Sequence, residues 1–211
     1  MINLKKIFLN ICIVIYFITV LLGVYINLKN GNYNELFMVG VAVFTPFLIP
    51  CLFYFCKFKL NDEILIINYI FVYFASLIGS GFNGYKIPFY DKLIHFSSGI
   101  IISMLIIIYW LINKNKIINR NENKLFLLFV FNTNLAIALL WEIFEYMMLI
   151  LFNNDCINHY KTGVHDAMTD TLCALVAGIY IVYLLNNDLN NKKQSLLINF
   201  CKKVSNNNQV K

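Results

Sequence analysis

The 211-residue chain is 60% hydrophobic and only 13% charged, whereas a typical soluble domain is roughly 25% charged. This composition excludes an ordinary soluble domain and indicates an integral membrane protein. The formal net charge of +6 does not indicate a nucleic-acid partner, because Lys and Arg lie in short loops and a tail beside apolar runs, as membrane topology requires. The partner that the composition predicts is the lipid bilayer.

Six apolar runs are long enough to cross a bilayer, since about 20 helical residues span a hydrocarbon layer of about 30 Å. In chain order we predict helices over residues 7–26, 35–55, 64–82, 91–112, 125–152 and 166–185. Pro46 and Pro50 are expected to kink the second helix. The predicted fold class is therefore an all-α polytopic six-helix bundle.

The predicted organisation is a single transmembrane domain over residues 1–186, followed by a polar, basic tail over 187–211. Within this tail, the short apolar piece 196–200 is expected on the membrane surface. Of the 17 Lys and Arg residues, 13 fall on the side of the two termini and four on the other side. Cytoplasmic loops are enriched in positive charge, so we expect both termini to be cytoplasmic.

Ionisable residues gather at one depth of the predicted bundle. A charged side chain near the bilayer centre costs roughly 2.5–3.5 kcal/mol on insertion scales, and such residues usually mark functional sites. With the predicted orientation, three helices bring their ionisable residues into the outer half of the membrane. These residues are Asp91 and His95 in the fourth helix, Glu142 and Glu145 in the fifth, and His165, Asp166 and Asp170 at the start of the sixth.

Helical spacing puts these side chains on shared faces. Asp91 and His95 are spaced i,i+4, and Ser98 continues their face; Asp166 and Asp170 have the same spacing. Lipid exposure is avoided most simply if the three polar faces point at each other. A structural alternative stands beside this interpretation, because a single carboxylate at a helix start, such as Asp91 or Asp166, is commonly a cap or dipole partner.

Such a cluster allows three kinds of chemistry. It can bind a divalent metal ion, act as a general acid and base, or pass protons or ions across the membrane. The candidate catalytic residues are Glu142, Glu145, Asp170 and His95. The candidate metal ligands are Asp91, His95, Glu142, Glu145, His165, Asp166 and Asp170. The transport interpretation is the weaker one, because the inner halves of these helices are mostly apolar.

Three segments resemble a known family when taken in order: 91–96 (DKLIHF), 141–145 (WEIFE) and 165–170 (HDAMTD), the last followed by small residues at 174–178. Over about residues 90–185 the chain resembles the YjdF-like bacterial membrane proteins of unknown function and, more distantly, VanZ-like proteins. The resemblance implies a multi-pass protein of the bacterial inner membrane. For VanZ-like relatives it also implies cell-envelope phenotypes such as tolerance of glycopeptide antibiotics. It implies no particular reaction.

The sequence departs from the VanZ-like pattern at Glu145, where that pattern more often has Gln, and at His165 and Asp166, where a basic residue often precedes the Asp. These departures favour the YjdF-like assignment. The leading functional hypothesis is a membrane-embedded hydrolase or transferase, metal-dependent or acid/base, acting on a lipid or lipid-linked envelope substrate at the outer leaflet. The alternatives are an ion-coupled transporter or permease and a non-catalytic envelope scaffold. Substrate, metal and oligomeric state stay open.

Overall fold

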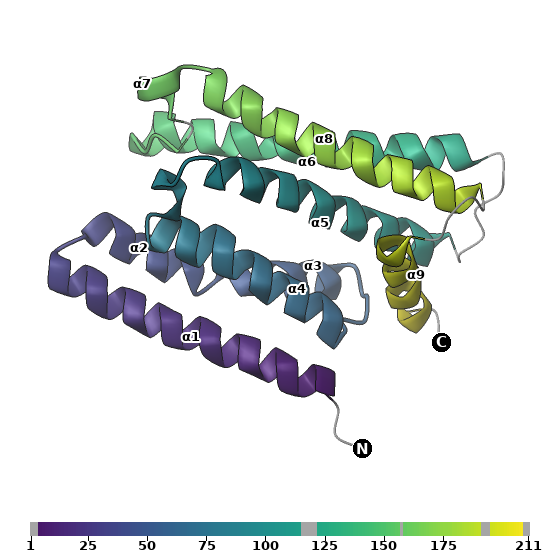
Figure 1. The fold of residues 1–211 in the computed structure, drawn as a ribbon, viewed down its shortest axis with the longest axis horizontal. Helices are drawn as coiled ribbons and strands as arrows, with labels where there is room; N and C mark the ends of the chain where they lie inside the picture. The colour runs from purple at the N-terminus through teal and green to yellow at the C-terminus, as the bar shows by residue number, and fades with distance from the viewer. Residues whose placement is uncertain (1–3, 115–121, 157, 191–194, 209–211) are drawn as a thin grey trace. The chain divides into compact units, whose positions relative to one another are not determined.

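The structure, a computed structural model, describes residues 4–114, 122–156, 158–190 and 195–208. Among these residues all regular secondary structure is helical, and six segments are long and apolar enough to cross a membrane (Figure 1). The predicted all-α, multi-pass membrane fold is therefore confirmed. By its internal contacts the chain divides into two compact units, residues 1–94 and 95–211. Five basic residues counted for the orientation lie outside the described residues: Lys116, Arg120, Lys192, Lys193 and Lys211.

The first unit holds the first three membrane spans. Its elements are α1 (Leu4–Asn30), α2 (Tyr33–Ala42), η1 (Thr45–Phe47), α3 (Leu48–Phe55), α4 (Asp62–Val72), η2 (Tyr73–Gly81) and η3 (Gly84–Lys86). The second span is interrupted between α2 and α3 around Pro46, where a kink was predicted, whereas Pro50 lies within the first turn of α3. The third span changes from α4 into the π-helical η2, which the sequence pattern did not predict.

The break in the second span is held by polar side chains of other helices. A proline has no N–H to donate to the carbonyl four residues earlier, so Pro46 leaves Ala42 O without its helical partner, and Pro50 leaves Pro46 O. The buried Tyr16 hydroxyl of α1 donates to Ala42 O at 2.6 Å, and the buried Asn68 amide of α4 donates to Pro46 O at 2.6 Å. Both carbonyls are therefore satisfied inside the first unit, as a membrane interior requires.

The π-helical η2 is supported in the same way. The Tyr85 hydroxyl donates to Ala75 O at 2.8 Å, and the Tyr90 hydroxyl donates to Phe74 O at 2.7 Å. A Cβ atom on Gly79 would lie 2.6 Å from the Tyr85 ring. The glycine therefore makes room for the tyrosine that covers the distorted segment.

The second unit holds the last three spans and a C-terminal helix. Its elements are α5 (Tyr90–Asn113), which begins in the last residues of the first unit, then α6 (Asn123–Phe152), α7 (His159–Thr162), α8 (His165–Leu189) and α9 (Leu196–Asn208). The three predicted helices are confirmed, and α8 extends four residues beyond its predicted end. Helices α6 and α8 lie side by side along their length (Figure 1).

Small residues of α8 let both of its neighbours approach closely. A Cβ atom on Gly99 of α5 would lie 2.8 Å from the Cβ atom of Ala177. On the α6 side, the buried Asn134 amide donates to Ala174 O at 2.9 Å, and a Cβ atom on Gly178 would lie 2.7 Å from Asn134 Nδ2. The small-residue run of α8 therefore brings α5, α6 and α8 into one close-packed core.

The segment expected as an apolar piece on the membrane surface is part of the longer helix α9. Its apolar face is buried on the protein through Ile198, Cys201 and Val204, and Cys201 Sγ contacts the Met104 carbonyl of α5 at 3.8 Å. The apolar face of α9 therefore packs on the second unit. The short apolar run at 196–200 did not reveal that the amphipathic pattern continues to Val204.

Candidate functional site

The centre of the candidate site is the imidazole of His95, one turn after the start of α5. Its Nδ1 atom lies 3.8 Å from Oε1 of Glu142 on α6, and its Nε2 atom lies 3.9 Å from Oδ1 of Asp170 on α8. The three side chains are only 13%, 8% and 3% exposed, respectively. We call His95, Glu142 and Asp170 the His95 cluster. It brings together three of the four predicted catalytic residues.

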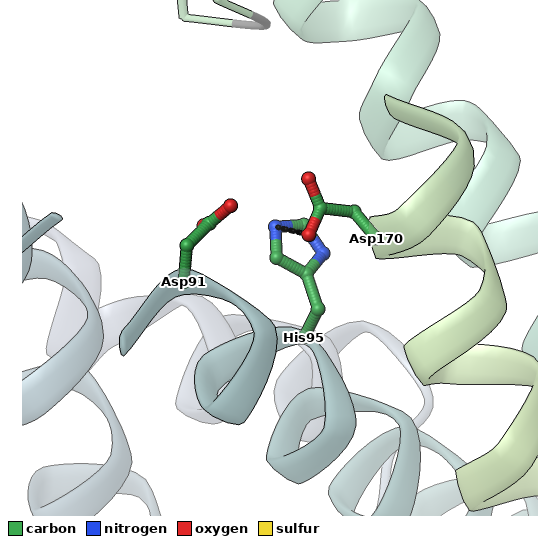
Figure 2. Close-up of side chains that lie close together, drawn as sticks. All are labelled: Asp91, His95 and Asp170. Atoms are coloured by element: carbon green, nitrogen blue, oxygen red, sulfur yellow. Dashed lines mark ion pairs between the residues drawn. The ribbon is translucent and has the colours of Figure 1, made fainter. Parts of the chain in front are cut away.

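Asp91 stands beside this cluster because α5 is one continuous helix, which puts Asp91 one turn before His95 (Figure 2). Among the described residues, Asp91, His95 and Asp170 form a group that can hold a metal ion, with one ligand atom from each lying within 4.8 Å of the others. Asp91 also forms an ion pair with Lys92 at 3.1 Å. Its place in the first turn of α5 suits a negative charge at the positive end of the helix dipole as well.

Helix packing explains why the cluster forms. His95 lies one turn from Gly99, and Asp170 lies one turn from Ala174, where α5 and α8 approach closely: a Cβ atom on Gly99 would lie 3.2 Å from Ala174 Cα. Glu142 lies two turns along α6 from Asn134, which is hydrogen-bonded to Ala174 O. The same contacts that pack the three helices therefore bring their ionisable side chains to one level.

The His95 cluster can hold a proton or a cation. A neutral imidazole offers one N–H donor, and its other nitrogen is an acceptor. Here a carboxylate faces each nitrogen, at distances beyond the roughly 2.7–3.2 Å of a direct N–H···O hydrogen bond. Two ionised carboxylates held close together in a buried site repel each other, and a proton or a cation between them reduces this cost. One proton, on His95 or on a carboxyl group, leaves these three side chains with one net negative charge, whereas a divalent cation bound between them offsets both carboxylates.

Glu145 has a different environment from Glu142. Its Oε1 atom accepts a hydrogen bond from the indole Nε1 of Trp141, on the same helix, at 2.8 Å. Its charge also affects Cys156 in the loop after α6. The pKa of Cys156 is raised to about 11, mainly by partial burial and, to a smaller extent, by the negative charges of Glu145 and Asp155. Glu145 is half-buried near the end of α6, whereas Glu142 is buried in the three-helix core.

The two remaining candidate ligands lie in the first turn of α8. His165 is exposed at the first position of the helix. Asp166 is half-buried and accepts a hydrogen bond from the Asn158 amide at 2.6 Å. This contact ties the start of α8 to the preceding loop, and the first-turn position of Asp166 agrees with the dipole-partner alternative rather than with an N-cap, since α8 has no side-chain cap hydrogen bond.

A second polar layer, formed by Ser103 of α5 and Asn134 of α6, lies below the His95 cluster. Ser103 Oγ and Asn134 Oδ1 are buried and have no hydrogen-bond partner in the described part of the chain. Ser98, which was expected to continue the polar face of α5, donates to the His95 carbonyl of its own helix at 2.8 Å. The signal that could have found Ser103 is its i+8 spacing from His95, with Gly99 midway.

Residues 9–191 match the model of a family described as predicted membrane protein (DUF2238). The chain belongs to this family. No curated protein and no solved structure matches the sequence. The family covers both units and the whole His95 cluster. Its description agrees with the multi-pass membrane fold and is consistent with the YjdF-like resemblance, whereas a link to VanZ-like proteins is not shown.

Proposed function

We propose that the His95 cluster is the reactive centre of a membrane-embedded enzyme of the DUF2238 family. The supporting observation is that one buried imidazole has a carboxylate facing each of its nitrogens, from two different membrane-spanning helices. Ionisable groups at such positions are costly unless they are paired, and they typically serve chemistry or conduction. The cluster has the components of a general acid/base centre, since it can hold one proton and exchange it between three groups.

A divalent metal ion is the cation that we propose for this centre. Asp91, His95 and Asp170 can each supply a ligand atom, and a mixed imidazole and carboxylate set suits Zn²⁺ or Mn²⁺. Glu142 then has a second role, because it faces Nδ1, the ring nitrogen on the other side from Asp170. A carboxylate at that position fixes the orientation and basicity of a metal-bound histidine.

The proposed substrate is a lipid or a lipid-linked envelope precursor, and the reaction a hydrolysis or a transfer. His95 and Asp170 each lie five residues after the first residue of their helix, which is about 8 Å at helical rise. That depth is reached by the polar linkage of a lipid, where the headgroup joins the acyl chains. With both termini cytoplasmic in a bacterial inner membrane, this end of the helices belongs to the outer leaflet.

No specific observation favours a transporter over this proposal. An ion-coupled permease needs a polar route to the opposite face of the membrane. In the described part of the second unit, the level beyond Ser103 and Asn134 is filled by Ile107, Val130 and Ile181, all fully buried. A scaffold role would explain the hydrogen bonds between helices, but not a histidine placed between two carboxylates.

Metal binding by purified protein tests the proposal. We expect the wild-type protein to retain Zn²⁺ or Mn²⁺ through size exclusion, with the Asp170→Asn variant losing it. Glu142→Gln should weaken the metal affinity by roughly 10–100-fold, as loss of a supporting carboxylate does. The matched control is Asp188→Asn, because Asp188 is also buried on α8 but pairs with Lys202. Equal metal retention by all four proteins, or none by the wild type, would overturn the metal centre.

A second measurement separates the acid/base centre from the metal. Wild-type protein and the Glu142→Gln variant are incubated with lipid extracts of a strain that lacks the gene, and new products are identified by mass spectrometry. Conversion by the wild type and not by Glu142→Gln supports the enzyme. Identical lipid profiles from both proteins, with metal present, count against it.

A further inference from the structure

We propose that the groove between α6 and α8 binds an anionic phospholipid, with its phosphate at Lys124 and an acyl chain along the two helices. This groove is separate from the His95 cluster and lies at the opposite ends of the same helices. The proposal is therefore independent of the proposed enzyme activity.

The groove has a volume of about 530 Å³, within the range of small-molecule sites, roughly 300–1,000 Å³. Its walls are apolar along most of their length and become polar at one end. From α6 it is lined by Leu127, Leu128 and Phe131, and from α8 by Ile179, Tyr183 and Asn186. Because α6 and α8 are membrane-spanning helices, the molecule that fills an open apolar groove between them is a lipid chain.

Helix register places Lys124 at the polar end of this groove. Asn134 of α6 lies level with the segment of α8 between Ala174 and Gly178, as its hydrogen bond and close approach show. The helices run antiparallel, so the position ten residues earlier on α6 is level with the position about ten residues later on α8. Lys124 is therefore level with Asn186, and both lie at the membrane boundary where α6 begins and α8 ends.

Charge selects the lipid class. Lys124 is exposed and has no ion-pair partner among the described residues. Lys114, near the same boundary, pairs with Glu122 at 3.4 Å and lies over the Trp110 ring at 5.7 Å. An available ammonium group at the headgroup level attracts anionic lipids. Lys124 therefore favours phosphatidylglycerol over a lipid without net charge, and Lys114 serves as a matched control.

Native mass spectrometry of the purified full-length protein tests this site. Protein in detergent micelles is titrated with phosphatidylglycerol or phosphatidylcholine, and the bound lipid is counted. We expect phosphatidylglycerol to bind more tightly to the wild type. Lys124→Gln should weaken phosphatidylglycerol binding roughly fivefold, the effect expected of one lysine at a membrane surface, without changing phosphatidylcholine binding. Lys114→Gln should behave as the wild type.

A groove-filling variant tests the acyl-chain part of the site. Ile179 is 52% exposed, so an Ile179→Trp side chain can occupy the groove without entering the core, and a thermal melt checks that the variant is folded. We expect it to weaken binding of both lipids. The proposal is overturned if phosphatidylglycerol and phosphatidylcholine bind equally to the wild type, or if Lys124→Gln and Ile179→Trp both bind as the wild type does. It is also overturned if a second copy of the chain covers the groove and excludes lipid.

Discussion

The two units of the chain bury polar side chains for different purposes. In the first unit the buried groups are neutral, and they donate to backbone carbonyls: Tyr16 to Ala42 O and Asn68 to Pro46 O. In the second unit, ionisable side chains of the His95 cluster face each other. Tyr16 and Asn68 each compensate for a proline in the backbone, whereas the His95 cluster compensates for no such distortion.

This difference separates a structural use of polarity in a membrane from a functional one. A hydroxyl or amide that satisfies a carbonyl freed by proline removes a cost that the backbone would otherwise bear. A histidine between two buried carboxylates adds a cost, which a proton or a cation held by the cluster reduces. Burial alone therefore does not identify a site. A functional site is identified by the groups that the buried side chain contacts.

The largest expected effect comes from removing the imidazole of the His95 cluster. In a His95→Leu variant, Glu142 and Asp170 remain buried without the imidazole between them. Removing one partner of a buried ionic cluster typically lowers the free energy of unfolding by about 3–5 kcal/mol. The free energy of unfolding, measured by denaturant titration in detergent, should fall by this amount at neutral pH. The triple variant His95→Leu, Glu142→Gln, Asp170→Asn should recover most of it, and equal losses in the single and triple variants would contradict the ionic account.

A smaller loss is expected in the first unit from Asn68→Leu. The substitution leaves Pro46 O buried without a donor, and an unsatisfied buried acceptor costs about 1–3 kcal/mol. The loss should depend on Pro50, since Pro50→Ala restores a backbone N–H that can donate to Pro46 O. In a double-mutant cycle, Asn68→Leu should therefore cost clearly less in the Pro50→Ala background. Additive effects would show that Asn68 acts in some other way.

The sequence predicted the helices and most of the site residues, but not the contacts that decide which polar side chains are buried. Hydrophobic runs and prolines predicted all six spans and the break near Pro46, because span length and proline chemistry are local properties. They did not predict the π-helical η2 or the partners of Tyr16 and Asn68, which depend on contacts between distant helices. For the site, i,i+4 spacing and a common depth predicted that Asp91, His95, Glu142 and Asp170 gather. Spacing alone did not separate Glu142 from Glu145, because only packing decides which carboxylate enters the core.

A still smaller effect is expected where α6 and α8 pack closely. In a Gly178→Ala variant the new methyl group meets Asn134 Nδ2, 2.7 Å from the Cβ position. Because this neighbour is a side chain that can shift, we expect a cost of about 1 kcal/mol, at the low end for overpacking. Adding Asn134→Ala should remove the clash, so that Gly178→Ala becomes nearly neutral in that background. Thermal denaturation of the four proteins of this cycle measures the coupling between positions 134 and 178. If Gly178→Ala destabilises the protein equally with and without Asn134→Ala, the new methyl group does not act through Asn134.

The smallest effect is on the reactivity of Cys156, which reports on the charge of Glu145. Cys156 is exposed, yet partial burial of its thiol and the Glu145 and Asp155 carboxylates raise its pKa to about 11. Only the thiolate reacts, so iodoacetamide labelling should be slow at pH 7.5 and should rise about tenfold per pH unit until the pH nears the pKa. Labelling is followed by mass spectrometry in a variant whose other cysteines are Ala.

In that background, Glu145→Gln removes a negative charge beside the thiol, lowers the pKa of Cys156 and should speed labelling at pH 7.5 by a few-fold. Trp141→Phe is the control, because it removes the hydrogen bond to Glu145 and leaves the charge in place; labelling should change much less. If Glu145→Gln and Trp141→Phe label at the same rate, Glu145 does not act on this loop. Its carboxylate would then have to be reconsidered as a member of the His95 cluster, which would change the count of charges that the proposed metal ion must balance.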